Sequence, residues 1–181
     1  MSLNFKHVPI EGLVLIEPVV KKDGRGYFME KYRRKDFAEA GIPDFVQDNY
    51  SFSNRGVIRA LHYQLAPHAQ GKLVSVVSGK AWDVAVDLRQ SSATFGKWFG
   101  VELSEDNNLS FYIPPGFAHG FAAISTEVRF FYKCTSEYDP ASERGIIWND
   151  PALAIDWHVS NPILADRDLV WPRLDKAETF I

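Results

Sequence analysis

The middle of the chain consists of short strand-like segments separated by turn residues, and this pattern constrains the fold more than any other feature. Residues 72–78 form an apolar run that stops at Gly79, and residues 80–88 then alternate between two faces. Further strand candidates are 97–103, 109–113, 119–123 and 128–134. Many short strands at such spacing are typical of an antiparallel sandwich or barrel. We therefore predict a mainly β, jelly-roll fold.

Helical patterning is scarce. The segment 35–40 (KDFAEA), followed by Gly41 and Pro43, predicts one short helix. Residues 162–168 predict another turn or two. A length of 181 residues fits a single domain over residues 1–181.

The segment 80–88 separates bulky from small or acidic side chains. One face carries Trp82, Val84, Val86 and Leu88, and the other carries Ala81, Asp83, Ala85 and Asp87. Two interpretations stay open at this point. The small and acidic face either lines a polar barrel lumen or faces solvent on the outside of a sheet.

Composition and charge exclude several classes of protein. The net charge of −3 gives no overall field that would attract nucleic acid, although a small phosphorylated ligand needs only a local basic pocket. No apolar run approaches the roughly 18 residues of a membrane span, and the N-terminus lacks a signal-peptide stretch. The single cysteine, Cys134, forms neither an internal disulfide nor a cysteine-based zinc site. We expect a cytoplasmic protein with no membrane or nucleic-acid partner.

Polar side chains interrupt several apolar strand candidates, at 47–51, 56–64, 70–72, 114–121 and 130–133. Buried polar groups are costly when unpaired, so such clusters hydrogen-bond to one another or to a ligand.

Two histidines in these clusters, His62 and His119, raise the question of a metal site. Gln64 stands two residues after His62, and Lys72 would place a positive charge where a cation should sit. Zinc and iron prefer imidazole, thiolate or carboxylate ligands. We predict that no metal binds here.

The remaining side chains suit proton transfer. A neutral His62 accepts a proton near pH 7, a tyrosine phenol can donate one, and Lys72 can stabilise a developing anion. A buried carboxylate would fix the imidazole tautomer. Taken singly, each of these residues is more often a structural residue than a functional one.

Several blocks of the sequence are distinctive when taken together: Asp23–Glu30, Gln47–Ser51, Gly56–Gln64, Gln70–Val74, Asp83–Arg89, Pro114–Phe121, Tyr132–Lys133, Tyr138 and Trp148–Asp150. Together they resemble one family, the dTDP-4-dehydrorhamnose 3,5-epimerases. The blocks appear in order over nearly the whole chain, which makes the resemblance far more specific than any single motif.

The resemblance implies a cupin-type jelly roll that forms a homodimer, binds a dTDP-sugar and uses no metal or other cofactor. It further implies that N-terminal strands within residues 1–50 are exchanged with the dimer partner, and that residues 165–181 form a C-terminal segment.

The resemblance also assigns roles to individual residues. It implies that His62 is the general base, that Asp168 orients it, with Asp166 as the neighbouring alternative, and that Tyr132 is the proton donor. Lys72 would face the sugar ketone. The implied sugar-pocket residues are Asp83 and His119, and the implied nucleotide-binding residues are Arg25, Phe28, Glu30, Gln47, Asn49, Arg59 and Tyr138. Arg25, Phe28 and Glu30 would come from the partner subunit.

The implied reaction fits the chemistry of these groups. A C4 ketone acidifies the C–H bonds at C3 and C5, so His62 can remove a proton, Lys72 can stabilise the enolate oxygen and Tyr132 can return a proton to the opposite face. The sequence also has no glycine-rich dinucleotide loop. Three alternatives stay open: a single-site epimerase or ketoisomerase, a non-catalytic sugar-binding cupin, and a metal-dependent oxygenase, which needs ligands that the chain lacks.

One pair of predicted site residues conflicts with regular strand geometry. Arg59 and His62 are three positions apart, so a regular strand would point them to opposite faces. If both line one pocket, the strand must contain a bulge or bend near Ala60.

Overall fold

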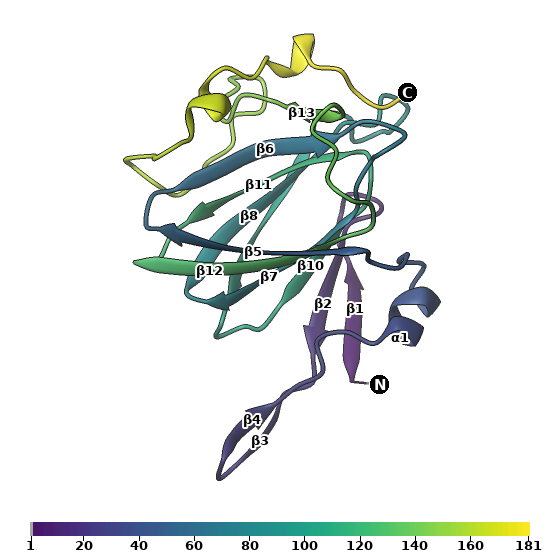
Figure 1. Cartoon of the computed structure of the whole chain (residues 1–181), viewed down its shortest axis with the longest axis vertical. Coiled ribbons are helices and arrows are strands. Elements are labelled where there is room, and N and C mark those ends of the chain that lie inside the picture. The colour runs from purple at the N-terminus through teal and green to yellow at the C-terminus, as the bar shows by residue number, and fades with distance from the viewer. Residues whose placement is uncertain (1) are drawn as a thin grey trace.

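Two antiparallel sheets form the body of the computed structural model, which describes residues 2–181; only the first residue of the predicted domain span lies outside the described residues. The six-stranded sheet has the order β1 (Leu3–His7), β2 (Val14–Pro18), β10 (Ser110–Ile113), β7 (Lys72–Ser78), β12 (Glu127–Cys134), β5 (Gln47–Asn54). The five-stranded sheet has the order β13 (Glu143–Gly145), β6 (Ile58–Gln64), β11 (Phe117–Ala123), β8 (Lys80–Asp87), β9 (Trp98–Ser104). The predicted mainly β, cupin-type jelly roll is confirmed (Figure 1).

Helices are few and short, as the sequence predicted. The α-helix α1 spans Arg34–Glu39, one residue earlier than expected. The predicted turn at 162–168 is a 3-10 helix, η1 (Asp166–Leu169), and a second 3-10 helix, η2 (Leu174–Lys176), follows it. None of the helices within residues 2–181 is long and apolar enough to cross a membrane.

Packing on both faces of β8 decides between the two interpretations of its alternating sequence. Ala81 and Ala85 face the core between the two sheets, together with Val74, Phe121 and Phe130. The opposite, bulky face of β8 packs against the C-terminal part of the chain and not against water. The small and acidic face of β8 is therefore buried inside the barrel and does not face solvent, and Asp83 on it is fully buried. None of its residues lines the two cavities described below.

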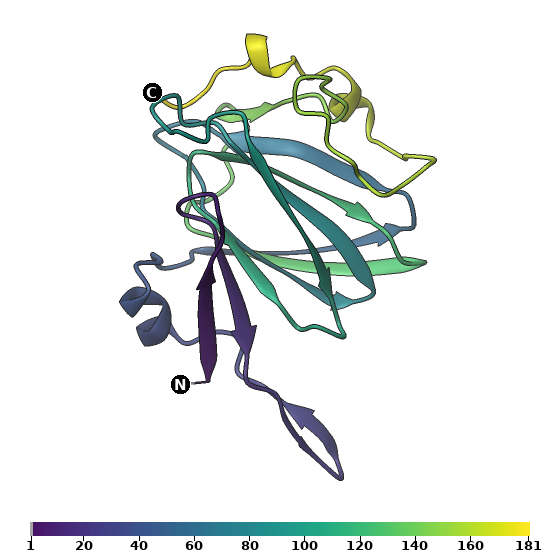
Figure 2. The same cartoon turned by 180° about the vertical axis from the view of Figure 1, so that it is seen from behind.

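The C-terminal segment crosses the outer face of the five-stranded sheet (Figures 1 and 2). It is held at three places by backbone hydrogen bonds. The Ile58 amide donates to the Ile163 carbonyl at 2.9 Å, Ile147 donates to Pro172 at 2.9 Å, and Phe180 donates to Leu88 at 3.0 Å. These attachments give the segment a fixed position beside β6.

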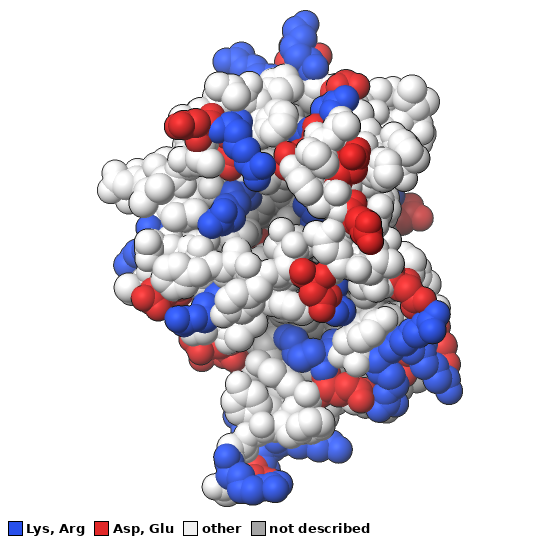
Figure 3. Space-filling model, in the orientation of Figure 1, with Lys and Arg blue, Asp and Glu red and all other residues white. Residues whose placement is uncertain are grey.

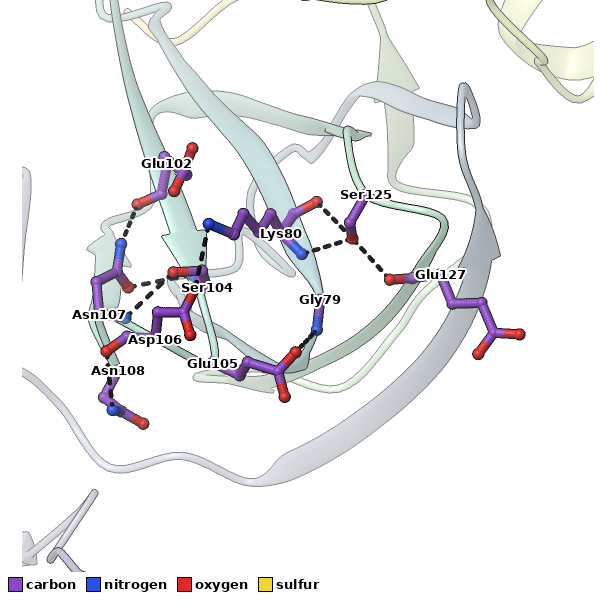
Figure 4. A network of polar contacts seen from close by, with 10 residues as sticks. All are labelled: Gly79, Lys80, Glu102, Ser104, Glu105, Asp106, Asn107, Asn108, Ser125 and Glu127. Atoms are coloured by element: carbon purple, nitrogen blue, oxygen red, sulfur yellow. Dashed lines mark hydrogen bonds and ion pairs between the residues drawn. The ribbon is translucent and has the colours of Figure 1, made fainter.

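The turn at Gly79 depends on the absence of a side chain. Gly79 has φ +86°, and a Cβ there would lie 2.0 Å from the Glu127 carbonyl oxygen. Around it, the Ser125 hydroxyl accepts from the Lys80 amide, and the Glu105 carboxylate accepts from the Gly79 amide (Figure 4). This network explains why the strand predicted from residue 72 ends at Gly79.

The hairpin of β3 (Lys21–Asp23) and β4 (Gly26–Phe28) projects away from both sheets (Figure 1). Its side chains include exposed aromatic rings, with Tyr27 61% and Phe28 70% accessible to solvent. Single exposed apolar residues are ordinary, but two adjacent aromatic rings on a projecting hairpin suit a contact with another molecule.

Candidate active site

Two adjoining cavities, of about 520 and 240 Å³, open between the sheets. The residues shared by both are His62, Lys72, Tyr132 and Arg167. The stacked rings of Phe121 and Phe130, with centroids 4.1 Å apart, form an apolar wall of the larger cavity. A concave site with an apolar wall and a few convergent polar groups is typical of small-molecule binding.

The five-stranded sheet supplies two histidine–carboxylate pairs. His62 on β6 lies beside His119 on β11 in the strand register. Nε2 of His62 lies 2.7 Å from Oδ1 of Asp168, whose side chain is 3% exposed. Of the two aspartates considered, the structure therefore brings Asp168 to His62, while Asp166 is exposed.

The second pair places Asp83 differently from the prediction. Nε2 of His119 lies 3.0 Å from Oδ2 of Asp83, and Asp83 is fully buried. His119 lines the cavity, whereas Asp83 lies behind it and is not among the lining residues. Burial lowers the pKa of His119, although the Asp83 charge partly opposes this shift. His119 is therefore neutral at pH 7.

The predicted bulge in β6 is present. His119 pairs with His62 and Phe121 pairs with Arg59, so two steps along β11 match three steps along β6. The extra residue lets Arg59 and His62 line the same cavity. Arg59 is held against β5, because its Nε donates to the Ser53 hydroxyl at 3.1 Å and its Nη2 donates to the Phe52 carbonyl at 3.2 Å.

The six-stranded sheet supplies Lys72 and Tyr132 from the opposite side of the cavity. Lys72 on β7 and Tyr132 on β12 lie on neighbouring strands, and Lys72 pairs with Cys134. Burial lowers the pKa of Lys72, an effect that the nearby Cys134 and Asp83 oppose. Burial also raises the pKa of Tyr132 above 10.0, which keeps its phenol protonated near neutrality.

The inner face of β5 carries a row of polar side chains at every second position. Gln47 and Asn49 line the smaller cavity, and Ser51 lines the larger one. The Gln47 amide nitrogen donates to Asn49 at 3.0 Å, and its oxygen accepts from the Tyr138 backbone amide at 2.8 Å. The Ser51 hydroxyl has no partner among residues 2–181, so it is a polar group left unpaired at the cavity.

Comparison with known proteins agrees with this geometry. The sequence profile of the dTDP-4-dehydrorhamnose 3,5-epimerases matches residues 7–176. The chain belongs to this family. An enzyme of that name from Shigella flexneri is 49% identical over 181 residues, covering 99% of this chain and 100% of the relative.

One solved structure of a similar protein contains a bound ligand, and a second relative is named for a related reaction. The dTDP-6-deoxy-D-glucose-3,5-epimerase of Legionella pneumophila, in complex with dTDP-4-keto-L-rhamnose, superposes with a TM-score of 0.92 at 47% identity, covering 96% of this chain and 94% of that chain. A dTDP-4-dehydrorhamnose 3-epimerase from Streptomyces niveus is 42% identical, covering 92% of this chain and 81% of the relative.

Two charged residues of the cavities were not predicted from the sequence. Glu143 on β13 accepts from the Tyr138 hydroxyl at 2.9 Å, and Arg167 lies 3.4 Å from the Glu143 carboxylate. Arg167 lines both cavities and directly precedes Asp168. The only feature of the sequence that could have identified Arg167 is its position next to Asp168. Glu143 could not be identified, because it stands in a loop-rich stretch without a periodic pattern.

Three predicted nucleotide-binding residues lie away from the cavities of their own chain. Arg25 and Phe28 are exposed on or beside the projecting hairpin, and Arg25 pairs with Asp23 at 2.6 Å. Glu30 accepts a hydrogen bond from Ser2 and pairs with Arg33 at 2.9 Å. Their supply to a partner subunit, as the sequence suggested, stays a prediction.

Positive charge at the site comes from a few individual side chains and not from a broad basic surface. Basic and acidic side chains are interspersed over the face drawn in Figure 3, with no continuous basic surface. Among residues 2–181, no group of three or more His, Cys, Asp or Glu side chains is arranged to hold a metal ion. Cations at the cavities come from Lys72, Arg59 and Arg167.

Proposed function

We propose that this chain inverts C3 and C5 of dTDP-4-dehydro-6-deoxy-D-glucose to give dTDP-4-dehydro-L-rhamnose, in dTDP-L-rhamnose biosynthesis. The observation that carries this proposal is the placement of the proton-transfer groups. His62, with its Asp168 partner, and Tyr132 belong to opposite sheets and line one cavity. Inversion of a carbon centre needs a base on one face and an acid on the other.

The first step is removal of a proton next to the C4 ketone. The Asp168 carboxylate at Nε2 favours the tautomer with the proton on that nitrogen, which leaves Nδ1 of His62 to accept the substrate proton. The electron pair of the broken C–H bond moves to O4 as an enolate. The Lys72 ammonium stabilises that oxygen in a site with little water.

The second step returns a proton to the opposite face. The Tyr132 phenol donates to the carbon, the enolate collapses to the ketone, and the phenolate regains its proton from solvent. His62 releases the abstracted proton to solvent, so no net proton or electron is consumed. Repetition at the second centre completes the double inversion.

The other residues that line the two cavities suit the binding of the nucleotide. Arg59 and Arg167 offer forked donors to the diphosphate, and Gln47, Asn49 and Tyr138 surround the smaller cavity, where we place the base. Arg25, Phe28 and Glu30 of a second subunit complete the nucleotide site in a homodimer. We place the enzyme in the cytoplasm, where its nucleotide-sugar substrate is made.

The deciding experiment follows solvent deuterium into the sugar. Incubation with dTDP-4-dehydro-6-deoxy-D-glucose in deuterated water should give product with deuterium at both C3 and C5 by NMR. A His62→Asn variant is the matched control and should give neither label nor product. Absence of exchange in the unmodified enzyme would contradict the proposal.

A single-site epimerase is the second candidate, because the Streptomyces niveus relative carries that name at 42% identity. The same spectra separate the two functions. Deuterium confined to C3, with C5 protonated after long incubation, would assign the chain to the single-site reaction.

Tyr132→Phe tests the proton donor separately from the base. We expect this variant to retain deuterium exchange at the position that His62 deprotonates, because the abstraction does not need the phenol. We expect epimerised product to fall by about a hundredfold or more. Unchanged epimerisation would remove Tyr132 from the mechanism.

A further inference from the structure

The C-terminal segment contacts the His62 ring at two different places. Asp168 reaches Nε2 at 2.7 Å, and three residues later the indole of Trp171 meets the imidazole edge to face, with centroids 6.4 Å apart and planes at 66°. This separation and angle fall in the favourable range for aromatic pairs. Both contacts come from a segment that is tethered beside β6, with Ile147 donating to the Pro172 carbonyl at 2.9 Å.

The indole of Trp171 lies where a side chain of β13 would otherwise stand. Gly145 is the register partner of His62, and a Cβ on Gly145 would lie 2.5 Å from the Trp171 ring. Real Cβ atoms do not approach that closely, so any other residue at 145 would displace the indole. The glycine therefore makes room for Trp171 beside the histidine.

Packing alone orients this indole. Its Nε1 is buried and has no hydrogen-bond partner among the described residues. A buried indole nitrogen without a hydrogen-bond partner lowers the stability of the fold. We therefore look for a functional reason for the position of this ring.

A single hydrogen bond does not fix an imidazole ring. The bond to Asp168 holds Nε2, but it leaves the ring free to pivot about the bond direction. A proton-transfer base needs its accepting nitrogen held within a fraction of an ångström and about 10–20°. A second contact on the ring edge removes this pivoting freedom.

We propose that Trp171 is a positioning residue that fixes the plane of the His62 ring, with Gly145 supplying the space that it occupies. This inference rests on the proposed role of His62 as the general base. Trp171 is absent from the linings of both cavities, so it acts through His62 and does not touch substrate.

Substitution of Trp171 tests the proposal by separating turnover from binding. Trp171→Ala should lower kcat by about tenfold, with KM and the affinity for dTDP changed less than about twofold. Trp171→Phe, which keeps an aromatic edge, should recover most of the lost kcat. Val170→Ala is the matched control, because Val170 is the neighbouring residue and is 79% exposed; it should keep full activity.

Substitution of Gly145 gives an independent test, because it disturbs the same contact between Trp171 and His62. Gly145→Ala should lower kcat in the unmodified background, because the methyl group displaces the indole. In the Trp171→Ala background the same change should cost less than about twofold, because there is no indole left to displace. The carbon-bound imidazole protons of His62, assigned with His62→Asn, should shift in the NMR spectrum when the indole ring is removed.

Three results would overturn the proposal. One is full kcat in Trp171→Ala together with unshifted His62 resonances. The second is additive loss in the double variant, and the third is a loss of activity only in proportion to the unfolded fraction seen in thermal melts. If Trp171→Ala does not fold, kcat and KM of Gly145→Ala and Trp171→Phe are compared with those of the unmodified enzyme instead. Failure of the proposed function would be visible earlier, as absence of deuterium exchange in the unmodified enzyme.

Discussion

At the scale of single residues, the proposed role of Lys72 predicts an upper pH limit on the reaction. Burial removes water from its ammonium group and lowers the pKa below the ordinary 10.5, while Tyr132 is shifted the other way, above 10.0. In the proposed reaction, loss of the Lys72 proton therefore removes the cation that stabilises the enolate, and it does so at a pH below the usual range for lysine.

We expect kcat to fall on the alkaline side at a pH below 10.5. A Lys72→Arg variant should have a lower kcat at pH 8, because its planar group fits the ketone differently, yet its alkaline decline should move to higher pH, because guanidinium stays charged. Rates measured from pH 7 to 10.5 test this. An alkaline limb identical in both enzymes would exclude Lys72 as its source.

The residues that sequence reasoning found and missed differ in a physical way. The family resemblance predicted His62, Lys72 and Tyr132 as site residues, and the structure brings all three to one cavity. Their polarity within apolar strands was a weaker signal, because buried polar groups also occur in structural roles. Trp171 and Glu143 could not be predicted, because their positions beside the site depend on contacts between segments far apart in the chain, such as the Gly145–Trp171 approach. Periodicity within one strand contains no information about such contacts.

At the scale of elements, strands with a buried apolar run or a clear alternation, bounded by turn residues, were predictable and the other strands were not. The bounds of β7, β8 and β12 were predicted to within one residue, and the bulge in β6 followed from requiring Arg59 and His62 in one pocket. Strand bounds in the first 30 residues were not predicted. β1 is only partly buried and β3 and β4 are fully exposed, whereas β2 has a buried face but is only five residues long. Strands that lack a buried face lose the alternation that identifies them.

The end of β8 contains a carboxylate that stabilises the fold. Burial favours a raised pKa for Asp87, but hydrogen bonds from Arg89, Ser92 and Thr94 outweigh it and lower the pKa to about 2. Because the folded-state pKa lies below the ordinary 3.8, the stabilisation is present above pH 4 and is lost as the pH falls toward 2. The contribution is at most about 2 kcal/mol.

Asp87→Asn tests this network without changing the size of the side chain. An amide accepts through one oxygen only and turns its NH₂ group toward the Arg89 donors, so we expect a clear loss of thermal stability at pH 7. The difference from the unmodified protein should narrow as the pH is lowered from 7 to 3. A difference independent of pH would mean that the ionised carboxylate contributes nothing.

At the scale of the whole molecule, three predicted nucleotide-binding residues, Arg25, Phe28 and Glu30, are absent from the linings of both cavities of their own chain. Arg25 and Phe28 belong to the β3–β4 hairpin, which projects from the barrel (Figures 1 and 2). No residue of this hairpin lines either of the two cavities. A hairpin with exposed aromatic rings is unfavourable in isolation, and a second subunit would bury it. The geometry of one chain thus agrees with exchange of this hairpin in a homodimer.

Subunit complementation tests the exchange directly. Arg25→Ala should raise KM for the dTDP-sugar, and His62→Asn should abolish turnover, so each homodimer is impaired. If the hairpin serves the partner, each mixed dimer contains one site with both defects and one site with neither. Co-expression at equal levels should then recover about a quarter of the unmodified activity, because half of the dimers are mixed and one site of each is intact. A hairpin that serves its own chain leaves no intact site in the mixed dimer, so activity that stays at the sum of the two variants would contradict the exchange.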